Sequence, residues 1–282
     1  MKEEEQVSDA RLCEAPLGSD RRQQSIDSER YDRSYFLSAC EGYAEFVASE
    51  GRHLSRRLEQ AFEVADVGEG MKVLDVGCGR GEVLQQCAER GAEAYGIDYS
   101  AVAARMASEL VGSTEGCDVL LGDAKVLPFC SGYFDRVLMF DLVEHLHPWE
   151  LRMALAEARR VMRPAGCLIV HTAPNAWYDR YAYPVVRLVR TLMGQGDDYP
   201  RDPRAITPVN LHVHVNEQSA LSLRDTLNRA SFRAQVWLDT PPQHRREGLT
   251  FRIARHVLFN WPPFRWFFER EVFAVARIDP GR

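Results

Sequence analysis

The sequence predicts an α/β fold in which helices cover both faces of a mostly parallel β-sheet. Between Met71 and Thr172, short apolar segments with strand character alternate with segments that have helical spacing. Successive β-α-β units of this kind build a parallel sheet through right-handed crossovers. With 282 residues, of which 45% are hydrophobic, the chain can bury one substantial core. We therefore expect one domain with insertions.

The composition argues against several classes of protein. A net charge of -6 gives no general attraction to nucleic acid or to an anionic membrane. The seven cysteines form no C-x-x-C pair, which argues against a zinc site and a disulfide framework and suits a reducing compartment. The first 16 residues are polar and acidic, unlike a signal peptide, and no apolar run reaches membrane-spanning length. We expect a cytoplasmic protein without a transmembrane segment.

The chain before the first strand falls into two parts. Residues 1–28 are charged and lack apolar periodicity, so we predict a flexible leader. Residues 29–67 place apolar side chains on one side of a helical pattern, which predicts two helices.

A glycine-rich turn follows the first strand. Met71–Gly81 reads MKVLDVGCGRG, a buried strand and three glycines at alternate positions, and Glu82–Arg90 continues as a helix. Glycine can adopt positive φ and lets a flat ligand approach the backbone, while the start of the helix favours an anionic group. The dinucleotide fingerprint G-x-G-x-x-G needs a glycine at position 82, where this chain has Glu82. The turn therefore argues against NAD.

Further strands and helices alternate after this turn. We predict strands at 93–97, 118–121, 134–140 and 167–172, and helices at 101–111 and 148–162. Asp98 follows the second strand, where an acid can accept hydrogen bonds from both hydroxyls of a ribose. It could instead cap the next helix, although Ser100 can also do so. The ligand crevice of a parallel sheet lies at these carboxyl ends of the strands.

The regular alternation stops after Ala173. Residues from about 174 to 213 form a first insertion, in which we predict a helix at 185–193, and a span of this length is typical of a functional lid. A short extended piece and a helix follow. The last two strands are predicted at 232–238 and 272–278, separated by a second insertion at about 239–270.

Three phrases resemble the motifs of one family, the class I S-adenosylmethionine-dependent methyltransferases. They are the glycine turn D-x-G-x-G-x-G, LLGDAKVLPF after the third strand and FDRVLMFDLVEHLHP around the fourth. The nearest types are small-molecule enzymes similar to those of glycan, cell-surface or quinone biosynthesis. The resemblance implies a Rossmann-like sheet of seven strands with the last one antiparallel, an N-terminal helical lid at 29–67 and a methyltransferase domain at 68–282. It also implies S-adenosyl-L-methionine as the cofactor.

The same resemblance implies roles in cofactor binding. Asp75 would interact with the amino end of the cofactor, and the glycine turn would pack against its methionine part. Asp123 and Ala124 would meet the adenine, and the backbone around Phe140 would border the cofactor. The candidate cofactor-binding residues are Asp75, Gly77, Cys78, Gly79, Gly81, Asp98, Tyr99, Asp123, Ala124 and Phe140.

The acceptor side is implied by the N-terminal lid and by two histidines. Tyr31 and Tyr35 are candidate pocket residues, unless they only pack the lid on the sheet. His145 and His214 are alternative catalytic bases, because an imidazole titrates near neutrality. For His145, a helix-capping hydrogen bond is an equally open interpretation. The candidate substrate residues are Tyr31, Tyr35, Glu144, Asn175 and Asn216.

Absent motifs narrow the acceptor. No [DN]-P-P-[YF] follows the fourth strand and no paired-glutamate hairpin is present, which argues against nucleic acid and protein arginine as acceptors. No compact Asp/Glu/His set suggests a magnesium site of the catechol type, so we expect no metal. Residues 241–270 combine six arginines and two acids with many aromatic residues. They could grip an anionic acceptor, rest on a membrane surface or cover an aromatic mini-core.

The predicted activity is methyl transfer from S-adenosylmethionine to a small-molecule acceptor. O-methylation of a sugar, a lipid-linked precursor or another metabolite is our first choice. The alternatives are a C- or N-methyltransferase of quinone or natural-product type and a non-catalytic S-adenosylmethionine-binding module. Glu82 disfavours an NAD dehydrogenase. The oligomeric state stays open.

Overall fold

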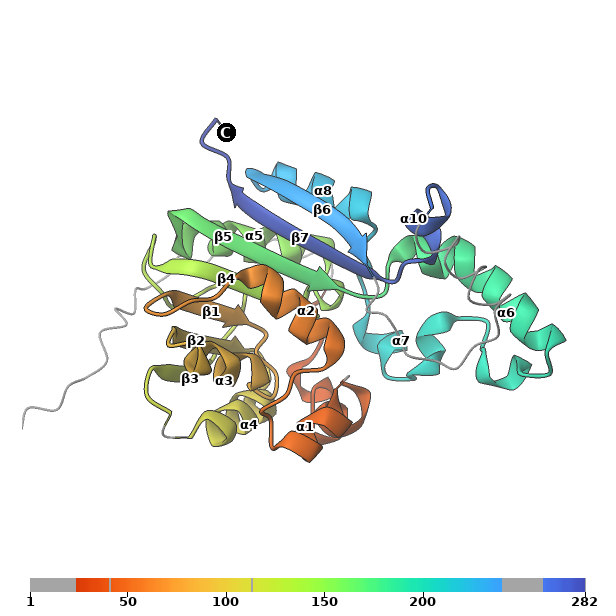
Figure 1. The fold of residues 1–282 in the computed structure, drawn as a ribbon, viewed down its shortest axis with the longest axis horizontal. Coiled ribbons are helices and arrows are strands. Elements are labelled where there is room, and N and C mark those ends of the chain that lie inside the picture. Colours follow the sequence, from red (N-terminus) through yellow and green to blue (C-terminus); the bar gives the residue numbers. More distant parts are fainter. Residues whose placement is uncertain (1–23, 41, 113, 240–260, 282) are drawn as a thin grey trace, which may run out of the picture.

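Seven strands form one sheet in the order β3-β2-β1-β4-β5-β7-β6 (Figure 1). The computed structural model describes residues 24–40, 42–112, 114–239 and 261–281. The strands are β1 (Lys72–Val76), β2 (Glu93–Asp98), β3 (Cys117–Leu121), β4 (Phe134–Phe140), β5 (Met162–Thr172), β6 (Phe232–Asp239) and β7 (Glu271–Ile278). Only β7 runs antiparallel, and it pairs with both β5 and β6. The predicted fold class is confirmed.

The strand order reverses direction at the pair β1 and β4, in the middle of the sheet. β1 pairs in parallel with β2 on one side and with β4 on the other. Val73, Leu74 and Val76 are fully buried, as expected for a strand covered on both faces. A ligand crevice opens at the carboxyl ends of the strands at such a reversal.

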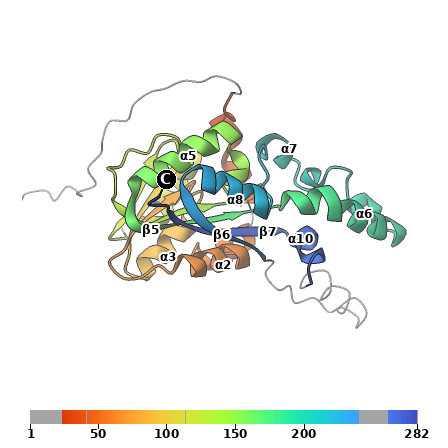
Figure 2. The same cartoon turned by 90° about the horizontal axis from the view of Figure 1, so that it is seen from above.

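Two layers of helices cover the sheet (Figure 2). One face carries α2 (Arg56–Ala65), α3 (Glu82–Glu89) and α4 (Ala101–Val111), which share a core with the inner strands. The other face carries α5 (Pro148–Val161) and α8 (Ala220–Arg229) over a second core. Each layer buries one apolar stripe of its helices. The turns at the carboxyl ends of the strands are thus held by a core on each face of the sheet.

Two predicted elements differ in the structure. β5 begins at Met162, five residues before the predicted start, because its pairing with β4 continues past an irregularity between Phe134 and Arg136. Such a bulge accommodates Pro164, which cannot donate to a regular ladder. The extended piece predicted from Asn210 onward begins instead with the helical turn α7 (Asn210–Val213), closed by the hydrogen bond from His214 N to Asn210 O of 3.0 Å.

The N-terminal segment folds over the carboxyl ends of the strands. It consists of η1 (Ser28–Arg30), the π-helical turn η2 (Tyr35–Ala39) and α1 (Tyr43–Ser49), followed by α2. Ser100 Oγ donates to the Tyr31 carbonyl at 2.7 Å, and Arg80 Nη1 donates to the Phe36 carbonyl at 3.0 Å. Both donors belong to the turns after β1 and β2, so the segment is fastened to those turns. A lid at 29–67 stays a prediction, and the predicted leader lies outside the described residues up to residue 23.

The first insertion builds an arm that projects to one side of the sheet (Figure 1). It contains η4 (Tyr178–Ala182), α6 (Tyr183–Leu192), η5 (Gly196–Asp198), η6 (Pro203–Ile206) and α7, and α6 agrees with the predicted helix within two residues. The short helix α10 (Phe264–Phe268) packs on its base, where Phe267 stacks on Trp177 with ring centroids 5.4 Å apart. Residues 240–260 of the second insertion lie outside the described residues. No helix in the described part of the chain is both long and apolar enough to cross a membrane.

Candidate active site

A cavity opens at the carboxyl ends of β1, β2 and β4, beneath the N-terminal segment. Its space measures about 1170 Å³, a figure that includes the open mouth and the solvent in it. The lining joins the turns that follow neighbouring strands, the place where ligands of such sheets bind. Predicted residues that line it are Tyr31, Tyr35, Asp75, Gly77, Cys78, Gly79, Asp98, Tyr99, Asp123, Ala124, Phe140 and His145.

Two of the three turn glycines face this cavity. Gly77 and Gly79 have φ of +81° and +54°, and the backbone N–H of Gly77 donates to the Ile97 carbonyl at 2.7 Å. These conformations favour glycine and bring the bare backbone to the cavity wall. Gly81 does not line it. A Cβ there would lie 2.9 Å from the Cα of Ala107, so this glycine serves the close approach of α3 to α4.

The Asp98 carboxylate is held at the cavity wall by backbone donors. Its two oxygens accept hydrogen bonds from Gly79 N at 2.9 Å and Ser100 N at 2.8 Å. Burial raises the pKa of Asp98, while these backbone N–H groups oppose the rise. The hydroxyl of Ser100 caps α4, so the alternative prediction that Asp98 caps this helix is wrong. Each carboxylate oxygen keeps a lone pair for a ligand.

Asp75 is a buried carboxyl group at the end of β1. It is 3% exposed, and burial together with the charges of Glu82 and Asp98 raises its pKa to about 8. Glu82 is compensated, because Arg80 Nη2 lies 2.6 Å from its carboxylate. No corresponding cation contacts Asp75 among the described residues. A ligand with a positive group beside Asp75 would supply the missing charge.

The charges of the lining favour a cationic ligand as a whole. Two basic residues, Arg80 and Lys125, face six acids. The acids are Asp75, Glu82, Asp98, Asp123, Asp141 and Glu150. Lys125 is itself engaged by Asp123 and Glu150, with its Nζ 2.9 Å and 2.8 Å from their carboxylates. The pyrophosphate of a dinucleotide would be repelled, whereas a sulfonium and an ammonium group would be attracted.

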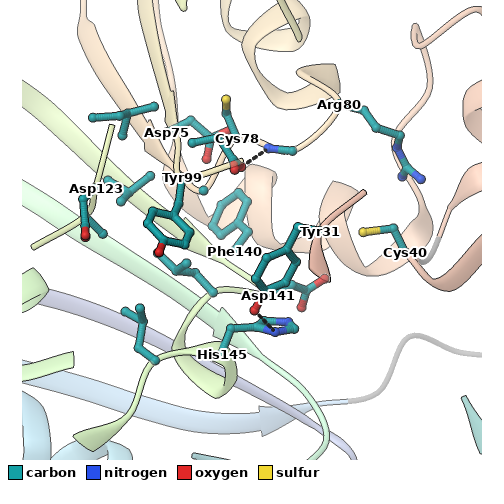
Figure 3. A pocket seen from close by; sticks show the side chains of 18 of the residues that line it. Tyr31, Cys40, Asp75, Cys78, Arg80, Tyr99, Asp123, Phe140, Asp141 and His145 are labelled. Carbon is teal, nitrogen blue, oxygen red and sulfur yellow. Dashed lines mark hydrogen bonds between the residues drawn. The ribbon is translucent and has the colours of Figure 1, made fainter. Parts of the chain in front are cut away.

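Tyr31 and His145 form a polar contact at the other end of the cavity. The Tyr31 hydroxyl lies 3.2 Å from His145 Nδ1, and Tyr35 packs edge-on against the Tyr31 ring (Figure 3). Burial and the neighbouring His214 lower the pKa of His145 to about 3, and burial raises the pKa of both tyrosines. The imidazole is therefore neutral at pH 7, and the predicted titration near neutrality is not found for His145.

Besides Gly81, four predicted residues lie outside the lining. His214 stands behind His145, with ring centroids 4.9 Å apart. Glu144 is 2% exposed and accepts a hydrogen bond of 2.7 Å from Thr172 Oγ1. The Asn175 amide donates to the Trp266 and Glu269 carbonyls and thus holds α10. Asn216 Oδ1 accepts from Gln218 Nε2 at 2.8 Å.

Sequence reasoning missed Asp141, which lines the cavity directly after β4. It has a φ of +50° and pairs with Arg57 at 2.9 Å and with His171 Nδ1 at 2.9 Å. Although burial opposes them, these two charges lower the pKa of Asp141. The buried His171 also contacts Glu271 at 2.9 Å, and the two acids raise its pKa to about 9 against the effect of burial. The position of Asp141 directly after a predicted strand was the one signal in the sequence that could have identified it.

Comparison with known proteins identifies a methyltransferase domain. A protein-family model described as a methyltransferase domain matches residues 74–170. This range contains the glycine turn, Asp98, Asp123 and Phe140. A probable S-adenosylmethionine-dependent methyltransferase of Mycolicibacterium smegmatis is 28% identical over 209 residues, 74% of this chain and 69% of that protein. The protein is an S-adenosylmethionine-dependent methyltransferase, with a methyltransferase domain at residues 74–170. Its cofactor is S-adenosylmethionine.

Other similar proteins agree with this family. The ubiquinone/menaquinone biosynthesis C-methyltransferase UbiE of Paraburkholderia phymatum is 33% identical over 153 residues, 50% of this chain and 60% of that protein. Among solved structures, the complex between the Haloferax volcanii Trm112 methyltransferase activator and the putative methyltransferase matches with a TM-score of 0.59 at 17% identity. The match covers 90% of this methyltransferase and 100% of that chain. At this identity the likeness shows the fold alone.

Proposed function

We propose that this methyltransferase transfers the methyl group of S-adenosylmethionine to an oxygen atom of a small-molecule acceptor, such as a sugar, a lipid-linked precursor or another metabolite. The observation that carries the proposal is the hydroxyl of Tyr31, fixed 3.2 Å from His145 Nδ1 on the cavity wall. A fixed hydroxyl can orient an acceptor oxygen by a hydrogen bond. Tyr35 would shield the same end from water.

The cofactor would lie along the acidic part of the cavity. Asp75 would contact the ammonium group of the cofactor, and the backbone of Gly77, Cys78 and Gly79 would pack on its methionine part. Asp98 would accept hydrogen bonds from both ribose hydroxyls. The adenine would lie against the part of the cavity wall that is formed by Tyr99, Asp123, Ala124 and Phe140.

The protein's own contribution to catalysis would be alignment and exclusion of water. A bound sulfonium already carries a reactive methyl group, so positioning of the acceptor supplies much of the rate. His145 would act mainly as an orienting group, because an imidazole whose pKa is lowered to about 3 is a weak base. His214 would hold the His145 ring from behind.

C-methylation is a second candidate, and the similarity to UbiE favours it. That relative is named a C-methyltransferase, and it is 33% identical to this chain over 60% of its own length. Because only 60% of that relative is covered, its acceptor is not assigned to this chain. N-methylation and a purely cofactor-binding role have no observation of their own in favour.

We also propose that residues 241–270 contact an anionic acceptor or a membrane surface. Of its described residues, Trp261, Phe264 and Trp266 are 61%, 46% and 51% exposed. Exposed aromatic side chains of this kind suit an interface between water and an apolar phase. A cytoplasmic location belongs to the same proposal.

Transfer from a labelled cofactor tests the proposal. Purified protein is incubated with a metabolite extract and S-adenosylmethionine carrying a ¹³C-methyl group, and products are found by mass spectrometry. The ¹³C chemical shift of the transferred methyl separates oxygen from carbon acceptors. An O-methyl product is expected, a C-methyl product would support the second candidate, and cofactor binding without any product would indicate a binding module.

Single substitutions test the role of the Tyr31 and His145 pair. Tyr31→Phe keeps the ring and removes the hydroxyl, so kcat should fall about tenfold, the value of one well-placed hydrogen bond. His145→Ala should also lower kcat, and neither change should alter cofactor affinity. His212→Ala, on the exposed side of α7, is the matched control. Normal turnover by both variants would remove the pair from the mechanism.

A further inference from the structure

Three potential metal ligands converge behind the His145 wall of the cavity, although they come from segments far apart in the sequence. Glu144, His145 and His214 each offer one ligand atom, and these atoms lie within 4.8 Å of one another. The backbone enforces this arrangement, because the N–H groups of Val215 and Asn216 both donate to the Glu144 carbonyl, at 2.9 and 3.1 Å. The segment that carries His214 is thus clamped onto η3 (Val143–His145).

Two buried polar atoms beside these ligands lack hydrogen-bond partners. His214 is 9% exposed, and its Nδ1 has no hydrogen-bond partner. The nearest carboxylate, Glu217 Oε1, lies 3.6 Å from that nitrogen and also lacks a hydrogen bond. Buried polar atoms normally have partners, so two orphans this close indicate a missing ligand.

Glu144 strengthens this argument through its charge. Its side chain is 2% exposed and accepts hydrogen bonds from two donors without charge, Thr172 Oγ1 at 2.7 Å and Ala173 N at 3.5 Å. No lysine or arginine pairs with it among the described residues. A buried carboxylate is stable when it is paired or coordinates a metal, and a cation between Glu144 and the two imidazoles would serve this purpose.

The chemistry of the set selects the kind of cation. Two imidazoles with one carboxylate suit zinc and its neighbours in the first transition row better than magnesium or calcium, which prefer oxygen ligands. Ligands of a tetrahedral zinc ion lie about 3.4 Å apart, so atoms that lie within 4.8 Å of one another have to approach by up to about 1.4 Å through side-chain rotation. His145 would keep its Nδ1 contact with Tyr31 and give up its hydrogen bond to the Val213 backbone, which is far weaker than coordination to zinc.

We propose that Glu144, His145 and His214 form a binding site for one divalent transition-metal ion of the zinc class, with Glu217 beside it. The sequence led us to expect no metal because the ligands are separated by 69 residues and follow no spacing motif. That the ion would adjoin the acceptor end of the cavity rests on the proposed function, whereas its binding does not.

Titration with Co²⁺ tests the site without any methyl transfer. The protein is freed of metal with a chelator and titrated with Co²⁺ in the absence of cofactor and acceptor. Visible absorption reports the coordination, and Zn²⁺ is then added as a competitor. One equivalent should bind with the absorption of a tetrahedral or five-coordinate site, and Zn²⁺ should displace it.

Matched variants locate the ion. His214→Ala and the isosteric Glu144→Gln should weaken Co²⁺ binding at least about tenfold, whereas His212→Ala, two residues from His214 and exposed, should bind as the unaltered protein does. Circular dichroism checks that each variant is folded, and Glu144→Gln decides if His214→Ala is not. Failure of the unaltered protein to bind, or equal binding by Glu144→Gln, would overturn the site. Either result leaves methyl transfer with Tyr31 intact as a proposal.

Discussion

At the scale of single residues, the proposed contact of Asp75 with the cofactor would link the stability of the protein to cofactor binding. The carboxyl group lies at the end of the central strand, 3% exposed, beside the acids Glu82 and Asp98. Burial keeps this carboxyl group protonated below about pH 8, so its ionisation costs free energy, and a bound cation would recover that cost. The ligand-free protein is therefore expected to be less stable than it would be with a neutral side chain at the place where we propose that the cofactor binds.

Asp75→Asn tests this link. The folded-state pKa is raised from 3.8 to about 8. From pH 4 to pH 8 the unfolded chain therefore loses this proton while the ligand-free folded protein keeps it, so the free energy of unfolding falls over this range. The neutral amide removes this effect, and the unfolding temperature of the variant should exceed that of the unaltered protein progressively over this range. Its affinity for S-adenosylmethionine should fall.

Thermal melts between pH 4 and pH 8 and calorimetric titration with the cofactor measure both effects. Asp225→Asn, an exposed acid on α8, is the control. An Asp75→Asn protein that is less stable at pH 8 but binds the cofactor normally would show that the carboxyl group has a structural role only.

Residues at the strand ends were accessible to sequence reasoning, and contacts across the chain were not. Asp75, Asp98 and Asp123 follow predicted strands, and the crevice rule for parallel sheets brings such positions together. The contact between Tyr31 and His145 joins residues 114 positions apart. It depends on how the N-terminal segment docks, which no periodicity encodes.

At the scale of elements, the turn after β1 combines two demands on glycine. Gly77 and Gly79 expose backbone to the cavity, whereas Gly81 lets α3 pass close to Ala107 of α4. From the sequence alone all three were assigned to ligand binding. The difference arises because a glycine reports conformation and space but does not say which neighbour needs the space.

Another element-scale feature is the buried bridge between β4, β5, β7 and α2. His171 on β5 contacts Asp141 after β4 and Glu271 on β7, each at 2.9 Å, and Arg57 on α2 pairs with Asp141. These side chains fasten the antiparallel end of the sheet to the strand that borders the cavity. Sequence patterns did not reveal the bridge because it joins four separate elements.

The bridge predicts a loss of stability at alkaline pH. The pKa of His171 is raised above 6.5 to about 9, so its contribution is complete below pH 6.5 and disappears as the pH rises through 9. At about 1.4 kcal/mol per unit of pKa, the loss in unfolding free energy is about 3 kcal/mol. Urea unfolding of the unaltered protein and of His171→Gln from pH 6 to pH 9.5 isolates this part, since other titrating groups cancel.

In that comparison, the free energy of the unaltered protein should fall with pH more steeply than that of His171→Gln. NMR titration of the His171 imidazole in the unaltered protein gives a second measurement that needs no variant. Parallel pH profiles, or a His171 pKa below 6.5, would show that the imidazole is neutral in the bridge.

At the scale of the whole molecule, the turns that line the cavity lie at the carboxyl ends of the strands, and the N-terminal segment folds over them. The strand order, the antiparallel β7 and the two helical layers were predictable, because they follow from alternation, from the handedness of crossovers and from the family resemblance. The arm of η4, α6 and α7 was predictable only as an insertion with one helix. Its packing rests on particular contacts such as Trp177 on Phe267.

The most direct test of the account is the ligand preference of the acidic cavity, measured as the shift in unfolding temperature. A ligand at one hundred times its Kd stabilises the folded state by about 2.7 kcal/mol, a readily detected shift. S-adenosylmethionine and its demethylated product should raise the unfolding temperature of the unaltered protein, and NAD should leave it unchanged. Stabilisation by NAD with none from S-adenosylmethionine would contradict the account.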